Sequence, residues 1–397
     1  MKNALSSMKK VLLRTLIILI AVVALLKISG YGYVLTAVNK SILDGHFGPG
    51  IYDLDKFPKN EIKPAEKRFE WKEKDKFIPL TSEENEFHKQ VRSTSFLVSY
   101  ADTLLSESYW GEHTLISYSN SFSMAKSITA TLCAIAVDKR EIKWEDPISL
   151  YIEETRGLDI GKLNFHQLLN MSANTSWSES GGNPFSNNAE AYYDTDLKEL
   201  LLTLEMKGKP GSKFNYQSGN TALAGWALSN AVGISISEYA EQNLWSKIGT
   251  NFPAYWSTDE DNNLEKAFCC FYAVSRDFAK LGRLWMNKGQ WDSTTTVFNA
   301  EQMDFLIGAQ EVDYNVCPDV CYGVAFWLEN YNGKKFYYAR GILGQYVIVI
   351  PEEQLIIVRT GHTRLDKNER YHPADLYEYV EQGLRMKTLY EKGHRVS

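Results

Sequence analysis

Several features that would place this chain of 397 residues in a special class are missing. Its 26 Gly and 11 Pro are too few for a collagen-like or low-complexity chain, and a hydrophobic fraction of 44% is too high for a disordered one. The net charge of −6, with no basic stripe in the main body, disfavours a nucleic acid partner. There is no G-x-S-x-G motif, so the nucleophile turn of an α/β-hydrolase is not expected. A globular chain long enough to bury a large core remains.

Cysteine is scarce, and its spacing does not indicate a zinc site. The chain has no C-x-x-C pair and no H-E-x-x-H sequence. Cys133 lies in an apolar helical stretch, which favours a free buried thiol. Cys317 and Cys321 flank a short loop that contains proline, and a disulfide between them, or from either to Cys269 or Cys270, fits an oxidising compartment. The sequence leaves this pairing open.

The N-terminus carries an apolar run close to the length of a membrane span. Residues 15–26 are uninterrupted apolar residues after one Thr, and four cations precede or border them: Lys2, Lys9, Lys10 and Arg14. This is the layout of a secretory signal. Residues 11–26 fall just short of the roughly 17 residues that a spanning helix needs. Because no clean small-x-small cleavage site follows, we favour an uncleaved signal anchor over a cleaved signal peptide, with the bulk of the chain exported.

Composition divides the chain into three segments. Residues 1–30 form the predicted signal anchor or signal peptide. Residues 31–90 are polar and irregular, with several Pro and Gly, and are predicted to be a tether that then wraps onto the body. Residues 91–390 carry the regular apolar patterns and form the main domain.

The main domain begins and ends with β-rich segments. Residues 95–100 and 113–119 are predicted to be the two strands of a hairpin. Four further strands are predicted near the C-terminal end: residues 322–329, 335–340, 345–350 and 355–361.

Helical patterns occupy the middle and the end of this domain. Residues 121–139 are small or apolar at nearly every position, which predicts a helix buried on most sides, and residues 140–290 carry further helical patches. Residues 373–386 are predicted to be a last helix. The order predicts an α/β (α+β) fold in which an antiparallel sheet from N- and C-terminal segments is flanked by helices and carries an inserted, mostly helical lobe.

A Ser-x-x-Lys pattern at Ser123 and Lys126 opens the predicted buried helix. A spacing of three places both side chains on one helix face, one turn apart. A serine hydroxyl needs a base before it can attack, and a lysine kept from water gives up its charge more readily. The free N–H groups at a helix start are suited to stabilise an oxyanion. The alternative interpretation is an N-capping serine followed by a surface lysine.

Two further motifs lie later in the chain. Tyr216 and Ser218 join a polar loop to an apolar helix, where a tyrosine can relay a proton into a cleft. The alternative is a tyrosine ring that packs on its own loop. Gly341 and Gly344 come just before a predicted strand and allow a backbone or ligand to approach closely, with a nearby N–H as a second oxyanion donor. The alternative there is a pair of β-bulge glycines.

In this order the three motifs resemble those of serine hydrolases in the class C β-lactamase and penicillin-binding protein superfamily. The chain is most similar to the 6-aminohexanoate-dimer hydrolase and esterase branch, over roughly residues 90–385. The resemblance implies that Ser123 is the nucleophile and that Lys126 and Tyr216 act as general base and acid. It implies an oxyanion hole made by the N–H groups of Ser123 and Ile342, and no metal or cofactor. Three residues are expected to contact substrate: Ser218, Gly341 and Gly344.

The motifs also depart from those of true lactamases. Ser218 stands where a lactamase has the Asn of Tyr-x-Asn, and residues 339–341 read Ala-Arg-Gly where it has Lys-Thr-Gly. These differences favour a small-molecule ester or amide substrate over a β-lactam, and Arg340 is either a binder of an acidic group or a solvated rim charge.

The sequence therefore predicts an exported serine hydrolase. It is expected to be anchored to the bacterial inner membrane with its catalytic domain in the periplasm, or to be released as a cleaved secreted form. Two alternatives stay open. One is a D,D-peptidase or weak β-lactamase acting on peptidoglycan-like substrates, and the other is a catalytically idle penicillin-recognising binding or sensor protein.

Overall fold

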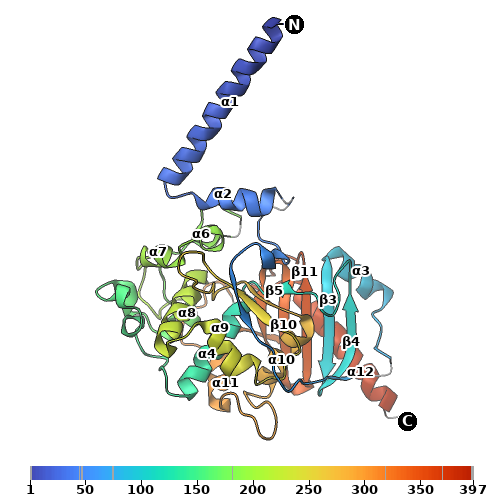
Figure 1. Ribbon diagram of the computed structural model, residues 1–397. Coiled ribbons are helices and arrows are strands. Elements are labelled where there is room, and N and C mark those ends of the chain that lie inside the picture. The colour runs from blue at the N-terminus through green and yellow to red at the C-terminus, as the bar shows by residue number, and fades with distance from the viewer. Residues whose placement is uncertain are drawn as a thin grey trace.

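The computed structural model describes residues 2–43, 45, 48–73, 76–180, 182–317, 319–368 and 370–394. Helix α1, Lys2–Ile28, extends away from the rest of the protein as a single rod (Figure 1). Its part from Ser6 to Ile28 is 23 residues long and apolar enough to cross a membrane, and its most apolar stretch is not buried in the protein. The helix therefore has the features of a signal sequence or an anchor.

The chain that follows α1 runs along the body before the main domain begins. Its regular elements are α2 Tyr33–Ala37, a π-helical turn Val38–Ile42, β1 Lys59–Ile62, β2 Lys72–Glu73 and α3 Ser82–Gln90. Four of its side chains are buried in the core: Tyr33, Ile51, Ile62 and Trp71. The predicted tether also contains residues that lie outside the described ones: 44, 46, 47, 74 and 75.

Seven strands form one sheet in the order β2-β4-β3-β11-β10-β9-β8. The strands of the main domain are β3 Ser93–Tyr100, β4 Thr103–Tyr109, β8 Trp327–Tyr331, β9 Lys334–Gly341, β10 Gln345–Ile350 and β11 Leu355–Gly361. N-terminal β3 pairs with C-terminal β11, with Val98 opposite Ile357. The pairs are antiparallel except for the edge pair β2/β4, which is parallel. The sheet thus joins the two ends of the main domain, as predicted.

Helices cover both faces of this sheet. Val347 and Val349 of β10 belong to the core cluster on the face covered by α10, Ser275–Met286. Ile348 and Ile350 belong to the cluster on the opposite face, where α12, Asp375–His394, packs. Because both faces are buried, β10 has a continuous apolar sequence instead of an alternating one.

The predicted N-terminal hairpin is correct in its first strand and wrong in its second. The partner of β3 is β4, Thr103–Tyr109, which follows a two-residue turn and buries Leu104 and Leu105 in the core clusters on the two faces of the sheet. Residues 113–118 form no strand, and Leu115 and Ile116 are exposed. Their β-branched and aromatic composition fits a strand only locally, whereas strand formation also needs a partner and a buried face.

A helical region lies between the two β-rich ends. It contains α4 Met124–Asp138, α5 Phe165–Leu169, α6 Asn187–Tyr193, α7 Leu197–Leu202, α8 Ser218–Val232, α9 Ile236–Ala240 and α11 Ala300–Ile307. In α4 every residue from Met124 to Ala136 is buried, since the helix packs against β9, β10, α8 and α9. The predicted buried helix is therefore confirmed, and it lies at the centre of the molecule (Figure 1).

A second, four-stranded sheet was not predicted and positions the start of α4. Its order is β1-β6-β7-β5, with β5 Ser119–Asn120, β6 Ala254–Ser257 and β7 Phe271–Ala273. Ser119 pairs with Ala273, and Asn120 pairs with Tyr272. Because β5 ends three residues before Ser123, this pairing brings the start of α4 next to the segment that precedes β7.

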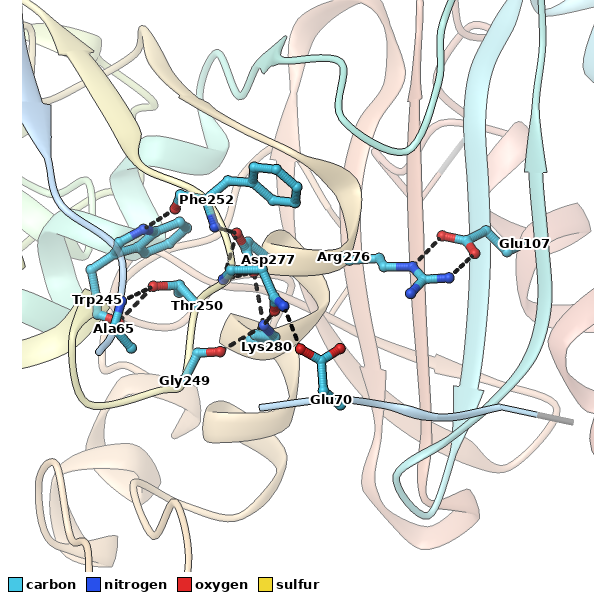
Figure 2. Close-up of polar contacts among 11 residues, drawn as sticks. Ala65, Glu70, Glu107, Trp245, Gly249, Thr250, Phe252, Arg276, Asp277 and Lys280 are labelled. Atoms are coloured by element: carbon cyan, nitrogen blue, oxygen red, sulfur yellow. Dashed lines mark hydrogen bonds and ion pairs between the residues drawn. The ribbon is translucent and has the colours of Figure 1, made fainter. Parts of the chain in front are cut away.

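Helix α10 fixes a turn of the chain through two buried charges (Figure 2). Asp277 and Lys280 are fully buried and form an ion pair of 3.0 Å. Asp277 accepts hydrogen bonds from the backbone N–H groups of Asn251 and Phe252, both at 3.0 Å. Lys280 donates to the carbonyl oxygen of Gly249 at 2.7 Å. The pair therefore provides hydrogen-bond partners for both N–H groups and a carbonyl group of the backbone in the turn at residues 249–252.

Candidate active site

Ser123 occupies the N-cap position of α4 but does not cap the helix. Its backbone is helical (φ −65°, ψ −4°), and its side chain makes no capping hydrogen bond. The hydroxyl is therefore available to other partners. Lys126, one turn later, is only 1% exposed. The alternative interpretation of an N-capping serine with a surface lysine is wrong on both counts.

The Lys126 ammonium nitrogen has three oxygen neighbours. It lies 3.0 Å from Ser123 Oγ, 2.9 Å from Ser218 Oγ and 3.0 Å from the carbonyl oxygen of Phe268. These neighbours come from three parts of the chain: α4, the start of α8 and the segment before β7. None of them carries a charge. Folding therefore places the buried nitrogen of Lys126 beside a serine hydroxyl. Its hydrogen-bond partners in the described part of the chain are all uncharged oxygen atoms.

Glu179 joins this group although nothing in the sequence singles it out. Its Oε1 accepts the hydroxyl of Ser218 at 2.8 Å, and its Oε2 accepts the Ser218 N–H at 2.7 Å. The indole N–H of Trp177 and the amide of Asn188 donate to the same carboxylate at 2.9 and 3.0 Å. Because Ser218 donates its proton to Glu179, its oxygen is left to accept from Lys126. No local sequence pattern could have identified Glu179, because it lies 39 residues from Ser218 in the chain.

Tyr216 lies on the loop directly before α8, as predicted. Its ring stacks on Trp327 with centroids 5.5 Å apart, and its edge meets the ring of Tyr322. The Lys126 nitrogen is 5.0 Å from the Tyr216 ring centroid. The ring therefore packs against strand β8 and the preceding loop, not only on its own loop, and it borders the same cavity as Ser123.

Gly341 ends strand β9 and touches the start of α4. A Cβ atom there would lie 2.2 Å from the carbonyl oxygen of Ser121 and 3.1 Å from Phe122, so the close approach requires glycine. This approach sets Ile342 at the rim of the cavity beside Ser123. Gly344 lies elsewhere: it is buried against Arg359, has φ +82° and does not line the cavity.

Two buried polar side chains hold the loop that carries Ile342. Gln345 donates to the carbonyl oxygens of Ile342 and Gly361, at 3.1 and 2.7 Å. Arg359 is fully buried and donates to the carbonyl oxygens of Leu343 and Gly344 at 3.0 and 2.6 Å. Its Nε donates to the hydroxyl of Ser93, and its other hydrogen bonds go to backbone carbonyls, so this buried guanidinium fixes the loop geometry.

A cavity of about 1010 Å³ connects these groups. Among its lining residues are five that the sequence pointed to: Ser123, Tyr216, Ser218, Gly341 and Ile342. The cavity also has a cationic side, formed by Arg340, Arg364 and Lys367.

Aromatic rings hold two of these cations. The Arg340 guanidinium lies 3.4 Å from the ring centroid of Trp327, and the Lys367 ammonium 3.4 Å from that of Tyr371. Burial, together with the nearby charges of Arg340 and Arg364, lowers the pKa of Lys367 to about 7. Positive charge is therefore concentrated on this side of the cavity.

The cysteines form two short-range disulfides. Cys317 bonds to Cys321, one of the pairings left open by the sequence, and Cys269 bonds to its neighbour Cys270, which was not anticipated. Cys269 lines the cavity, one residue after the carbonyl that accepts from Lys126. Cys133 is a free buried thiol whose pKa is raised by burial.

This arrangement is compatible with nucleophilic chemistry by a serine. Its central group is a hydroxyl in contact with the buried side-chain nitrogen of Lys126, at the start of α4 and beside the end of β9. Within the described part of the chain, no group of three or more His, Cys, Asp or Glu side chains is arranged to hold a metal ion.

Comparisons with known proteins agree with this architecture. A family profile described as Beta-lactamase matches residues 80–379. A 6-aminohexanoate-dimer hydrolase from Paenarthrobacter ureafaciens is 24% identical over 212 residues, which are 51% of this chain and 54% of that protein. The chain thus matches only about half the length of this curated relative.

Solved structures show the same fold. A candidate 6-aminohexanoate-dimer hydrolase from Bacillus anthracis has a TM-score of 0.71 at 19% identity, covering 86% of this chain and 94% of that one. A candidate β-lactamase from Bacteroides dorei DSM 17855 has a TM-score of 0.63 at 18% identity, covering 78% and 99%. At these identities the similarity establishes the β-lactamase-like arrangement of sheet and helices and no more.

Proposed function

The chain belongs to the β-lactamase family, and from this membership we propose that it cleaves an ester or amide bond through an acyl-enzyme formed at Ser123. The observation that carries the proposal is the contact between the Ser123 hydroxyl and the buried nitrogen of Lys126, at 3.0 Å. A serine next to a desolvated amine has the partner that it needs to become a nucleophile.

The first step transfers the hydroxyl proton of Ser123 to Lys126 as Oγ attacks the substrate carbonyl carbon. A neutral amine has two N–H bonds and one lone pair. The carbonyl of Phe268 accepts one N–H, and Ser218 Oγ, whose own proton goes to Glu179, accepts the other. The lone pair is therefore directed at Ser123. In this scheme Glu179 is a positioning residue, because it acts through Ser218.

The tetrahedral intermediate carries its negative charge on the former carbonyl oxygen. Ser123 at the helix start and Ile342 after the end of β9 both line the cavity, and we assign the oxyanion hole to their backbone N–H groups. When the intermediate collapses, the bond to the leaving group breaks and Tyr216 gives that group its proton, which Tyr216 regains from Lys126. Water then attacks the acyl-enzyme and frees the acid and Ser123.

The departures from lactamase motifs favour an ester or linear amide as the substrate. Ser218 stands where lactamases have Asn, so the chain has no side-chain amide at this position for a β-lactam. The Ser218 hydroxyl is instead hydrogen-bonded to both Lys126 and Glu179. The names of the similar hydrolases point to amide cleavage in those proteins. Gly341 would face the bound substrate at the end of β9.

We also propose that the enzyme acts outside the inner membrane. Helix α1 would anchor residues 1–30, residues 31–90 would join the anchor to the body, and residues 91–390 would form the catalytic domain. The cations before the apolar stretch of α1 favour a cytoplasmic N-terminus.

The test uses the full-length chain purified in detergent. A fluorophosphonate probe should label the wild type and should not label Ser123→Ala. Ser127→Ala is the matched control, since Ser127 lies one turn further along α4 and its hydroxyl bonds to Ala325. It should keep full labelling. Equal labelling of the wild type and Ser123→Ala would refute the proposal.

A substrate screen separates the remaining functions. A short chromogenic ester, a linear amide and a penicillin are compared for turnover by the wild type and by Ser123→Ala. Turnover of ester or amide above penicillin supports the proposal. Faster acylation by penicillin identifies a D,D-peptidase or weak β-lactamase, and acylation that is never released identifies a sensor protein.

A further inference from the structure

The wall of the cavity on the side of α1 comes from the segment directly after that helix. Five cavity-lining residues belong to this segment: Ala37, Ser41, Ile42, Gly48 and Pro49. In Figure 1, α2 crosses between the base of α1 and the helical part of the body. The catalytic cavity is therefore completed by residues that the main domain does not contain.

This wall is fixed to the body by buried contacts. Tyr33 is only 3% exposed, and the hydroxyl of Ser41 meets that of Tyr193 on α6 at 2.8 Å, out of contact with water. The segment after α1 is therefore packed beside α6, and its side chains belong to the wall of the cavity.

The wall is apolar where it faces the cavity, and the apolar surface continues outward. Beside Ala37 and Ile42, the cavity is lined by residues on and before α6, some apolar or aromatic (Pro184, Ala189, Tyr192 and Tyr193) and some polar (Asn183 and Asn188). At the outer rim, Val38, Leu43 and Phe185 are exposed, and the ring of Tyr31 meets that of Phe185 with centroids 5.1 Å apart.

Tyr31 lies three residues beyond the end of α1. Exposed apolar groups thus lead from the candidate membrane helix to the cavity, a pattern that marks binding sites for apolar ligands or lipid surfaces. Arg340, Arg364 and Lys367 also line the cavity, and their charged groups are unsuited to contact with an alkyl chain.

We propose that the substrate is an amphiphile, an ester or amide with a long alkyl chain, and that this chain lies against the wall formed by Ala37, Ile42 and Pro49 and enters from the membrane surface. The inference rests on the proposed hydrolysis at Ser123 and adds the class of substrate. The alkyl chain would leave water and contact Ala37, Ile42 and Pro49. This favours binding in proportion to the apolar surface area that is removed from water.

The test compares two chromogenic esters, a butyrate and a decanoate, on the full-length protein in phospholipid nanodiscs. The wild type should have a kcat/KM for the decanoate at least about tenfold above that for the butyrate. Ile42→Glu should remove this preference by raising KM for the decanoate, with the butyrate unchanged. Leu389→Glu is the matched control, because Leu389 on α12 is exposed and apolar, lies outside the segment after α1 and does not line the cavity. It should retain the preference.

A second measurement needs no variant. Of two alkyl fluorophosphonates, with chains of two and ten carbons, the one with ten carbons should inactivate the wild type faster. Equal rates, no preference between esters, or an equal loss on both esters in Ile42→Glu would overturn the inference. If butyrate is hydrolysed through Ser123 and the chain preference is absent, the proposed function stands and only the substrate class fails. If Ser123 is never labelled, both fail.

Discussion

Two buried lysines in this protein have the same local setting and opposite surroundings. Lys126 on α4 and Lys280 on α10 each follow, by three residues, a polar partner on the same helix face. Their exposed fractions are 1% and 0%. The partner of Lys280 is the carboxylate of Asp277, whereas that of Lys126 is the hydroxyl of Ser123.

The contacts that complete each environment separate the two lysines further. Burial lowers the pKa of Lys280 and raises that of Asp277, while their mutual attraction opposes both changes and keeps them an ion pair. This pair binds backbone groups at residues 249–252 and so has a structural task. Lys126 is surrounded by Ser123, Ser218 and a carbonyl, none of which is charged. Burial is thus common to both lysines, and the charge of their partners is what distinguishes the lysine of the ion pair from the lysine that we propose as the base.

The largest expected effect is the loss of activity in Lys126→Met. Without a proton acceptor at Ser123, kcat for a short ester should fall about 10²- to 10⁴-fold. The thermal unfolding midpoint should change little, because methionine fills the space and no charge is stranded. Both quantities are measured on the same preparation. A variant with normal turnover would show that Lys126 is not the base.

Lys280→Met should have the reverse effect. It leaves the Asp277 carboxylate buried without its counter-ion, which costs about 3–5 kcal/mol of stability in urea unfolding. The fraction that remains folded should keep the wild-type kcat. The double variant Asp277→Leu, Lys280→Met should recover part of the loss, since it removes both charges. A strong loss of kcat in folded Lys280→Met would remove the distinction between the two lysines.

His88 provides a pH test of the structural half of the molecule. Burial lowers the pKa of His88 to about 4 from the ordinary 6.5, and its ring nitrogens lie 2.8 Å from Ser93 Oγ and 3.0 Å from Gln382 Oε1. The unfolded chain binds its proton first as pH falls, so stability is complete above about pH 6.5 and is lost toward pH 4. Urea unfolding should show a loss of about 2 kcal/mol between pH 7 and pH 5.

The control for this effect is His88→Gln. Glutamine keeps polar atoms in the pocket but does not titrate, so its unfolding free energy should vary less over the same pH interval. An unchanged pH dependence in this variant would assign the effect to other groups.

The smallest effect is expected at Glu179. In Glu179→Gln the amide no longer accepts from all four of its donors, so Ser218 is free to give its proton to Lys126 and compete with Ser123. We expect kcat to fall about tenfold with KM nearly constant, together with a displaced pH profile of kcat/KM. Glu179→Asp should recover part of the activity. A change in unfolding midpoint with an unaltered pH profile would indicate a purely structural role.

Local pattern anticipated much of the fold, and five of the residues that it singled out line one cavity: Ser123, Tyr216, Ser218, Gly341 and Ile342. The buried helix after Ser123 and the strands from Lys334 to Gly361 are as predicted, since their apolar content exceeds what a surface element can carry. The strand β4 was missed, because Leu115 and Ile116 gave a stronger β pattern in a segment that folding leaves exposed. Glu179 and the bond between Cys269 and Cys270 were missed because neither has a signature in its own neighbourhood.

The sequence by itself determined the order of the motifs, the spacing of Ser123 and Lys126 on one helix face and the apolar strands that form the sheet. Asp277 and Lys280 have the same spacing on their helix. The sequence therefore could not tell which other groups would surround each of the two lysines. Only the tertiary structure decided this. Ser218 and Phe268 reach Lys126 across 92 and 142 residues of chain, and partners at such distances are set by how the helices and strands pack together.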